Sequence, residues 1–180
     1  MSWSIHLGTV AGTTLRLHVT FFLLLVWIGT VRYAEGGAAG ALDGVIFVLA
    51  AFLCVVLHEF GHIFAARRYG IRTPEITILP IGGLAHLERM PSSPRQELVV
   101  AIAGPLVNVA IAAALFTILG ARFDLAEMAE LERAQTSLTG RLAAVNVVLV
   151  VFNLIPAFPL DGGRIFRALL AMRMPRVRAT

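Results

Sequence analysis

The sequence has no lysine, a single cysteine and few charged side chains of either sign. All fifteen basic residues are arginine, and 14% of the 180 residues are charged whereas 58% are hydrophobic. Soluble domains carry roughly a quarter charged residues, so a soluble enzyme is excluded. The lone Cys54 excludes an intrachain disulfide. This composition predicts an integral membrane protein with a single domain, residues 1–180.

Four apolar stretches are about as long as a membrane crossing requires, which is roughly 20 residues for a helix. The first contains Arg32, whose long side chain can reach the interface. That stretch could instead be a cleaved signal peptide, but a long region precedes it and Arg16 is its only basic residue. We expect four spanning helices, at Val19–Ala34, Gly44–Ala66, Leu98–Gly120 and Leu142–Leu160.

The arginines lie at the ends of these stretches, which favours a role in membrane orientation over nucleic-acid binding. With a cytoplasmic N-terminus, eleven of the fifteen arginines face the cytoplasm, all except Arg32, Arg122, Arg133 and Arg141. The positive-inside rule favours that arrangement. The expectation is a multi-pass cell-membrane protein that contacts the lipid bilayer, with both termini cytoplasmic and no nucleic-acid partner.

The second stretch contains an HExxH motif, His58 to His62. Two histidines four residues apart share one helix face and can bind one metal ion, and Glu59 beside them can take a proton from an attacking water. A chance match in a soluble helix is disfavoured because the flanking residues are apolar on all sides. His58 lies nine residues before Arg67, about 14 Å along a helix, so the metal would lie within the bilayer, nearer the cytoplasmic face. Cys54, one turn before His58, could be a further ligand, although buried free cysteine usually packs as a hydrophobe.

A catalytic zinc takes three protein ligands and keeps one open position. Asp43 lies fifteen residues before His58, about 22 Å along a helix, and is too distant. Asp161 is the best remaining candidate, because Pro156 and Pro159 interrupt the helix before it and two glycines follow it. Asp161 could instead cap the helix that follows. Three residues between the second and third spans also remain open as ligands: Glu75, His86 and Glu88.

Three segments complete the expected architecture. Residues 1–18 mix apolar and polar side chains and are expected to lie along the membrane surface. Residues 74–88 have strand-like runs around a Pro-Ile-Gly-Gly turn and predict a re-entrant β-hairpin that dips into the cytoplasmic membrane face. Arg164–Met174 predicts a short amphipathic helix. The expected fold class is an all-α polytopic membrane protein with four transmembrane helices, this hairpin and this terminal helix.

The HExxH motif together with Asn153-x-x-Pro-x-x-Pro-x-Asp161-Gly-Gly resembles the site-2 protease family of intramembrane zinc metalloproteases. Gly82-Gly83 and Ala103-Gly104-Pro105-Leu-Val-Asn108 also resemble the core of that family. The resemblance implies one zinc per chain, with His58, His62 and Asp161 as ligands. It further implies Glu59 as the base and Asn153 as a candidate oxyanion partner, although Asn153 could simply bond between helices. The implied substrate is a single-span membrane protein or peptide, cut in or near its transmembrane segment.

The loop from Gly70 to Glu97 is too short for the PDZ insertion of one branch of that family, so the chain resembles the compact branch. Members of that branch commonly continue into further spans and CBS domains. This chain is either a natural minimal form or a truncated core of such a protein, and we expect the truncated core. Two other functions remain open. A membrane metal-ion transporter or metal-binding protein could use the same two histidines and Asp161, and an inactive scaffold could bind single-span partners.

Overall fold

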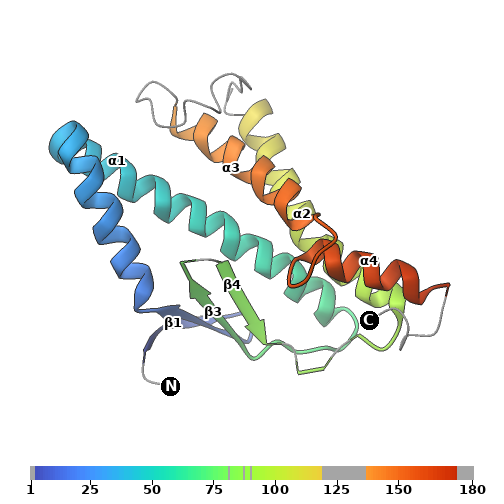
Figure 1. Ribbon diagram of the computed structural model, residues 1–180. Coiled ribbons are helices and arrows are strands. Elements are labelled where there is room, and N and C mark those ends of the chain that lie inside the picture. The colour runs from blue at the N-terminus through green and yellow to red at the C-terminus, as the bar shows by residue number, and fades with distance from the viewer. Residues whose placement is uncertain (1–2, 81, 87, 90, 119–136, 174–180) are drawn as a thin grey trace.

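The computed structural model describes residues 3–80, 82–86, 88–89, 91–118 and 137–173. The chain is mostly helical, with a small sheet on one side (Figure 1). In chain order the elements are β1 (Ser4–Val10), β2 (Thr13–His18), α1 (Thr20–Arg67), β3 (Glu75–Leu79), β4 (Gly82–His86), α2 (Pro94–Thr117), α3 (Leu138–Asn153) and α4 (Asp161–Ala171). The expected fold class is therefore incomplete, because four strands are present where one two-stranded hairpin was predicted.

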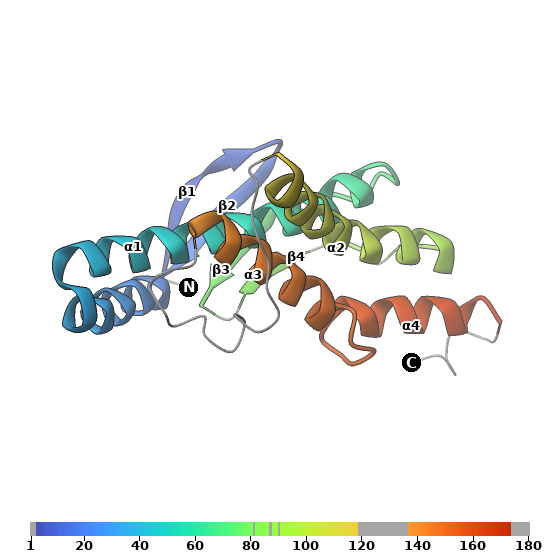
Figure 2. The same cartoon turned by 90° about the horizontal axis from the view of Figure 1, so that it is seen from above.

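Helix α1 consists of two arms that run alongside each other (Figure 2). Its helical geometry breaks at Gly36 and Gly37, and Gly37 has φ 61° and ψ −152°, a region that is essentially restricted to glycine. Gly40 and Gly44 then keep the arms close, since a Cβ at either would approach Arg32 to 2.6 or 2.7 Å. The small-residue turn predicted near residues 36–44 is thus a sharp break at two glycines followed by helix.

Two helices in the described part of the chain are long and apolar enough to cross a membrane. They are α1, with 48 residues in its two arms, and α2, with 24 residues. Helix α3 is apolar but shorter, with 16 residues. It ends at Asn153, seven residues before the predicted end of the fourth span, because the segment containing Pro156 and Pro159 forms turns instead.

The sheet has the order β1-β2-β3-β4. The two outer pairs are antiparallel, whereas β2 and β3 are parallel. Residues 1–18, expected only as a surface segment, thus contribute two of the strands. Their hairpin turns at Ala11 and Gly12, both with positive φ, as a tight hairpin turn requires. The hairpin expected over residues 74–88 is present as β3 and β4, and its depth in a membrane remains a prediction.

One face of the sheet is apolar and packs against the second arm of α1. Leu17 and Ile78 form a buried cluster with Phe21, and Ile76 forms another with Phe60 and Ile63. On the opposite face, Arg16 pairs with Glu75 at 2.8 Å. Because strand side chains alternate between faces, the sheet covers the helix that carries the HExxH motif and presents its polar side away from it.

Helices α2 and α3 lie on the other side of this arm (Figure 1). Ser93 begins α2 by accepting a hydrogen bond from the Gln96 amide, with Pro94 at the first position, where proline is favoured. Arg141 of α3 is buried, pairs with Asp43 of α1 at 2.5 Å and lies over the Phe47 ring. These contacts join α3 to the second arm of α1 near the arm's start.

Candidate metal centre

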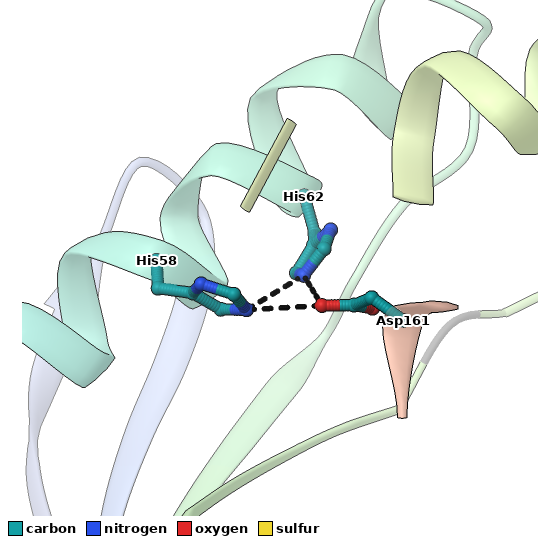
Figure 3. A group of neighbouring side chains, drawn as sticks. All are labelled: His58, His62 and Asp161. Atoms are coloured by element: carbon teal, nitrogen blue, oxygen red, sulfur yellow. Dashed lines mark hydrogen bonds and ion pairs between the residues drawn. The ribbon is translucent and has the colours of Figure 1, made fainter. Parts of the chain in front are cut away.

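Three side chains from two distant segments converge at the centre of the fold (Figure 3). His58 and His62 lie one turn apart on α1, and both Nε2 atoms point toward Asp161. Asp161 Oδ2 is 3.1 Å from His58 Nε2 and 3.0 Å from His62 Nε2, and the two nitrogens are 3.1 Å apart. All three residues are less than 8% exposed. The structure therefore brings together the three residues that the sequence motifs single out.

A hydrogen bond to the backbone fixes the tautomer of the His62 ring. Its Nδ1 is 2.7 Å from the carbonyl oxygen of Val100, which can only accept, so Nδ1 carries the proton. In a neutral ring Nε2 then presents a lone pair to Asp161 Oδ2, which also presents lone pairs. Lone pairs that point at one another repel, unless a cation lies between them and binds both. Ligand atoms at 2.0–2.1 Å from a tetrahedral zinc lie about 3.3 Å from one another, close to the spacing found here, so the donor set fits zinc.

Glycines allow α2 to approach this cluster closely. A Cβ at Gly104 would come within 2.2 Å of His62 Nε2 and 2.7 Å of His58 Nε2. On α1, a Cβ at Gly61 would come within 2.7 Å of the Ala103 carbonyl oxygen. The backbone of α2 therefore forms one wall of the site, at a place where a larger residue would displace the imidazoles.

Asp161 is the first residue of α4, and the N-cap is Leu160, which makes no side-chain capping bond. The alternative prediction, that Asp161 is the helix cap, is therefore wrong, because its carboxylate faces the histidines instead. Gly162 and Gly163 fit against the backbone of residues 154–158, where a Cβ would come within 2.2 and 2.8 Å of carbonyl atoms. The second carboxylate oxygen, Oδ1, is 3.5 Å from Arg164 Nη1.

Glu59 lies between the cluster and the sheet. It is half-buried, and a Cβ at Gly83 of β4 would come within 2.9 Å of its Oε1. Because a Cβ points off the face of a sheet, the carboxylate lies over the face of β4, an outer strand of the four-stranded sheet, and near both histidines. A carboxylate in that position can accept a proton from a water held at the cluster.

The other candidate ligands lie outside this cluster in the described part of the chain. Cys54 is buried and accepts a hydrogen bond from Asn146 Nδ2 at 3.3 Å. Glu75 pairs with Arg16, and Glu88 is exposed. His86 is the last residue of β4.

The two asparagines of the sequence motifs differ in their surroundings. Asn153 ends α3 and donates from Nδ2 to the Leu149 carbonyl oxygen at 2.9 Å. Its oxyanion role remains a prediction. Asn108 is fully buried on α2, one turn beyond Gly104, and neither of its side-chain atoms has a hydrogen-bond partner in the part of the chain described.

Several contacts of the site were not predicted from the sequence. The contact of His62 with the Val100 carbonyl is made by the backbone, so no residue type in the sequence could have indicated it. Arg164 has a signal in retrospect, because it lies three residues after Asp161 on a helix and shares a face with it.

Comparison with known proteins supports the same assignment. The family model for peptidase family M50 matches residues 46–180. The chain is 37% identical to zinc metalloprotease MJ0392 of Methanocaldococcus jannaschii, over 100% of this chain and 49% of that protein. It is 32% identical to the putative zinc metalloprotease Rip3 of Mycobacterium tuberculosis, over 94% and 44%. It is 29% identical to stage IV sporulation protein FB of Bacillus subtilis, over 92% and 51%.

The chain thus spans about half the length of the curated relatives it matches. Among solved structures, the site-2 protease from Methanocaldococcus jannaschii superposes with a TM-score of 0.71 at 34% identity, covering 98% of this chain and 76% of that one. The family match covers three quarters of the sequence and includes both HExxH and Asp161. This chain therefore belongs to peptidase family M50, whose members are intramembrane zinc proteases.

Proposed function

We propose that this chain is the core of a zinc endopeptidase that hydrolyses peptide bonds in or near the transmembrane segment of single-span membrane proteins. The observation that carries the proposal is the convergence of His58, His62 and Asp161 beside Glu59 and the outer strand β4. Zinc held by these three ligands would supply Lewis acidity to the attacking water and to the scissile carbonyl.

The residues of the chain have separate roles in this reaction. Glu59 accepts a proton from the attacking water and later donates it to the leaving amine. Arg164 holds Oδ1 of Asp161, so Oδ2 remains directed at the histidines. Asn153 is proposed to donate a hydrogen bond to the oxyanion. One of its two Nδ2 protons is donated to the Leu149 carbonyl, and the other can be donated to the substrate. One zinc per chain is proposed, and the single His/His/Asp group among the described residues supports that number.

The proposed arrangement has four crossings, both termini in the cytoplasm and the site nearer the cytoplasmic face. Support for the first two crossings comes from the parallel pairing of β2 with β3. These strands flank α1, whose two arms lead out from β2 and back to β3. The chain thus returns to the sheet from which α1 starts, which supports two crossings with both ends of α1 on one side of the membrane.

The substrate is proposed to bind as an added strand on β4. A helical segment hides its peptide bonds in internal hydrogen bonds, whereas an extended segment at a sheet edge exposes them. On an edge strand, amides point alternately toward β3 and outward.

The test places proline at Leu84 or Ala85, neighbours on β4 of which one backbone N–H points outward and the other toward β3. Proline at the residue whose N–H points outward should lower cleavage, with zinc content and thermal stability unchanged. Proline at the other member, the matched control, should lower stability as well. Undiminished cleavage by the outward-facing variant would exclude strand addition.

The decisive experiment compares the wild-type chain with Glu59→Gln, which keeps the side-chain shape and removes the base. Each protein is reconstituted in vesicles with a panel of single-span peptides, and zinc content is measured on both. We expect about one zinc in each and cleavage by the wild type, with a loss of about 10²–10⁴-fold in the variant. Zinc flux across the vesicle membrane that is equal in both proteins, without cleavage by either, would favour the metal-transporter function and refute the protease.

A further inference from the structure

A buried ion pair connects the helix that carries Asp161 to the helix that contacts His62. Glu97, in the first turn of α2, is 3% exposed. Its Oε1 accepts a hydrogen bond from Arg167 Nε of α4 at 2.9 Å and a second from Arg167 Nη2. The Arg167 side chain is 15% exposed. Neither residue belongs to the metal cluster, so the reaction described above uses neither charge.

The same part of α2 contacts the histidine half of the site. Val100, three residues after Glu97 and fully buried, provides the carbonyl that binds His62 Nδ1 at 2.7 Å. Gly104, one turn further, lies against the rings of both histidines. A single rigid helix therefore carries the contact that orients His62 and the carboxylate that holds α4.

Arg167 also contacts the turn that leads into Asp161. Its guanidinium lies 5.3 Å from the ring centroid of Phe158, in the segment between α3 and α4. Helix α4 has 11 residues and packs against α2, so its position along α2 determines where Asp161 lies. Arg167 is six residues from Asp161 on α4, less than two turns, and a shift of α4 at Arg167 would move the Asp161 carboxylate by a similar distance.

We propose that Glu97 and Arg167 are positioning residues that set the distance between Asp161 and the two histidines, and so set the zinc affinity of the site. This inference rests on the proposed zinc-dependent function. Removing Glu97 deprives the largely buried Arg167 guanidinium of this carboxylate, and removing Arg167 takes away the hydrogen bonds that tie α4 to Glu97. In either variant α4 would shift along α2. Two histidines alone would then hold the metal, with Asp161 displaced.

The test measures zinc binding to the full chain in detergent by competition with a chelator of known affinity. The variants are Glu97→Gln, Arg167→Met and the conservative Arg167→Lys, with Arg173→Met as the matched control because Arg173 is exposed near the end of α4. Loss of a group that orients a metal ligand typically weakens metal binding by about 10–100-fold. We expect that loss for Glu97→Gln and Arg167→Met, a smaller loss for Arg167→Lys, and no change for Arg173→Met.

Cobalt substitution distinguishes positioning from general stabilisation. Displacement of Asp161 changes the ligand field, so the visible absorption spectrum of the cobalt protein should change in Glu97→Gln and Arg167→Met. Wild-type zinc affinity and an unchanged cobalt spectrum in variants that merely melt at lower temperature would overturn the inference. If Glu97→Gln does not fold, Arg167→Lys, which retains the charge, is tested instead by its zinc affinity and its cobalt spectrum. A wild-type chain that binds no zinc would instead overturn the proposed function itself.

Discussion

Gly104 provides a sharp test of the geometry of the site. Alanine at this position places a Cβ 2.2 Å from His62 Nε2, 2.5 Å from its Cε1 and 2.7 Å from His58 Nε2. The nearest atoms belong to both imidazoles, and His62 is also held by the Val100 carbonyl, so neither ring can rotate away without losing a contact. Either α2 moves outward or the histidines leave their ligand positions.

The expected magnitude follows from the cost of overpacking, about 1–3 kcal/mol. If that cost is borne by the zinc-bound state, zinc affinity falls by about 5–150-fold, at roughly 1.4 kcal/mol per tenfold. The assay is chelator competition on Gly104→Ala and wild type in detergent. The control is Gly29→Ala, where the added Cβ would lie 3.6 Å from Val45, an ordinary contact remote from the metal. Zinc affinity of Gly104→Ala within twofold of wild type would refute the close approach of α2 to the histidines.

Three further perturbations test other parts of the structure. Gly37→Ala forces an L-residue into φ 61° and ψ −152°, so the free energy of unfolding should fall by about 1–3 kcal/mol; a thermal melt equal to that of Gly36→Ala, whose φ is negative, would contradict this. Asp43→Asn leaves the buried Arg141 charge without its carboxylate, so the free energy of unfolding measured by chemical denaturation should fall by about 1–3 kcal/mol. The control is Glu35→Gln, because Glu35 is exposed and pairs with Arg32; it should change that free energy by less than about 1 kcal/mol. Removal of zinc with a membrane-permeant chelator should abolish cleavage, and added zinc should restore it; cleavage that persists in the chelated protein would exclude a metal-dependent reaction.

The metal centre could be located from the sequence because its residues lie in two compact motifs. The i, i+4 spacing of His58 and His62 fixes their common face on any helix. Pro156, Pro159 and the glycines after Asp161 mark a break in the helix, and the structure has turns at that place. Both signals depend only on residues close together in the chain, and a sequence pattern can indicate geometry of that kind.

The parts that could not be predicted depend on contacts between distant residues. Strand β2 pairs with β3 across the whole of α1, Leu17 opposite Ile78, and nothing within residues 1–18 indicates that partner. The alternation of Leu15 and Leu17 was a strand signal, but it was short and adjoined an apolar helix. The ion pair between Glu97 and Arg167 likewise joins residues 70 positions apart, with the whole of α3 between them.

The pairing of β2 with β3 also has a consequence for how the protein is made. The first hairpin leaves the ribosome long before its partner, because Leu17 must await Ile78, about 60 residues later. At about 5–20 residues per second, the apolar side of that hairpin waits several seconds while α1 is synthesised. Asp161 is synthesised about 100 residues after His58. A nascent chain therefore has no complete zinc site until nearly all of this core has been translated, and we expect it to remain proteolytically silent while other membrane proteins are inserted nearby.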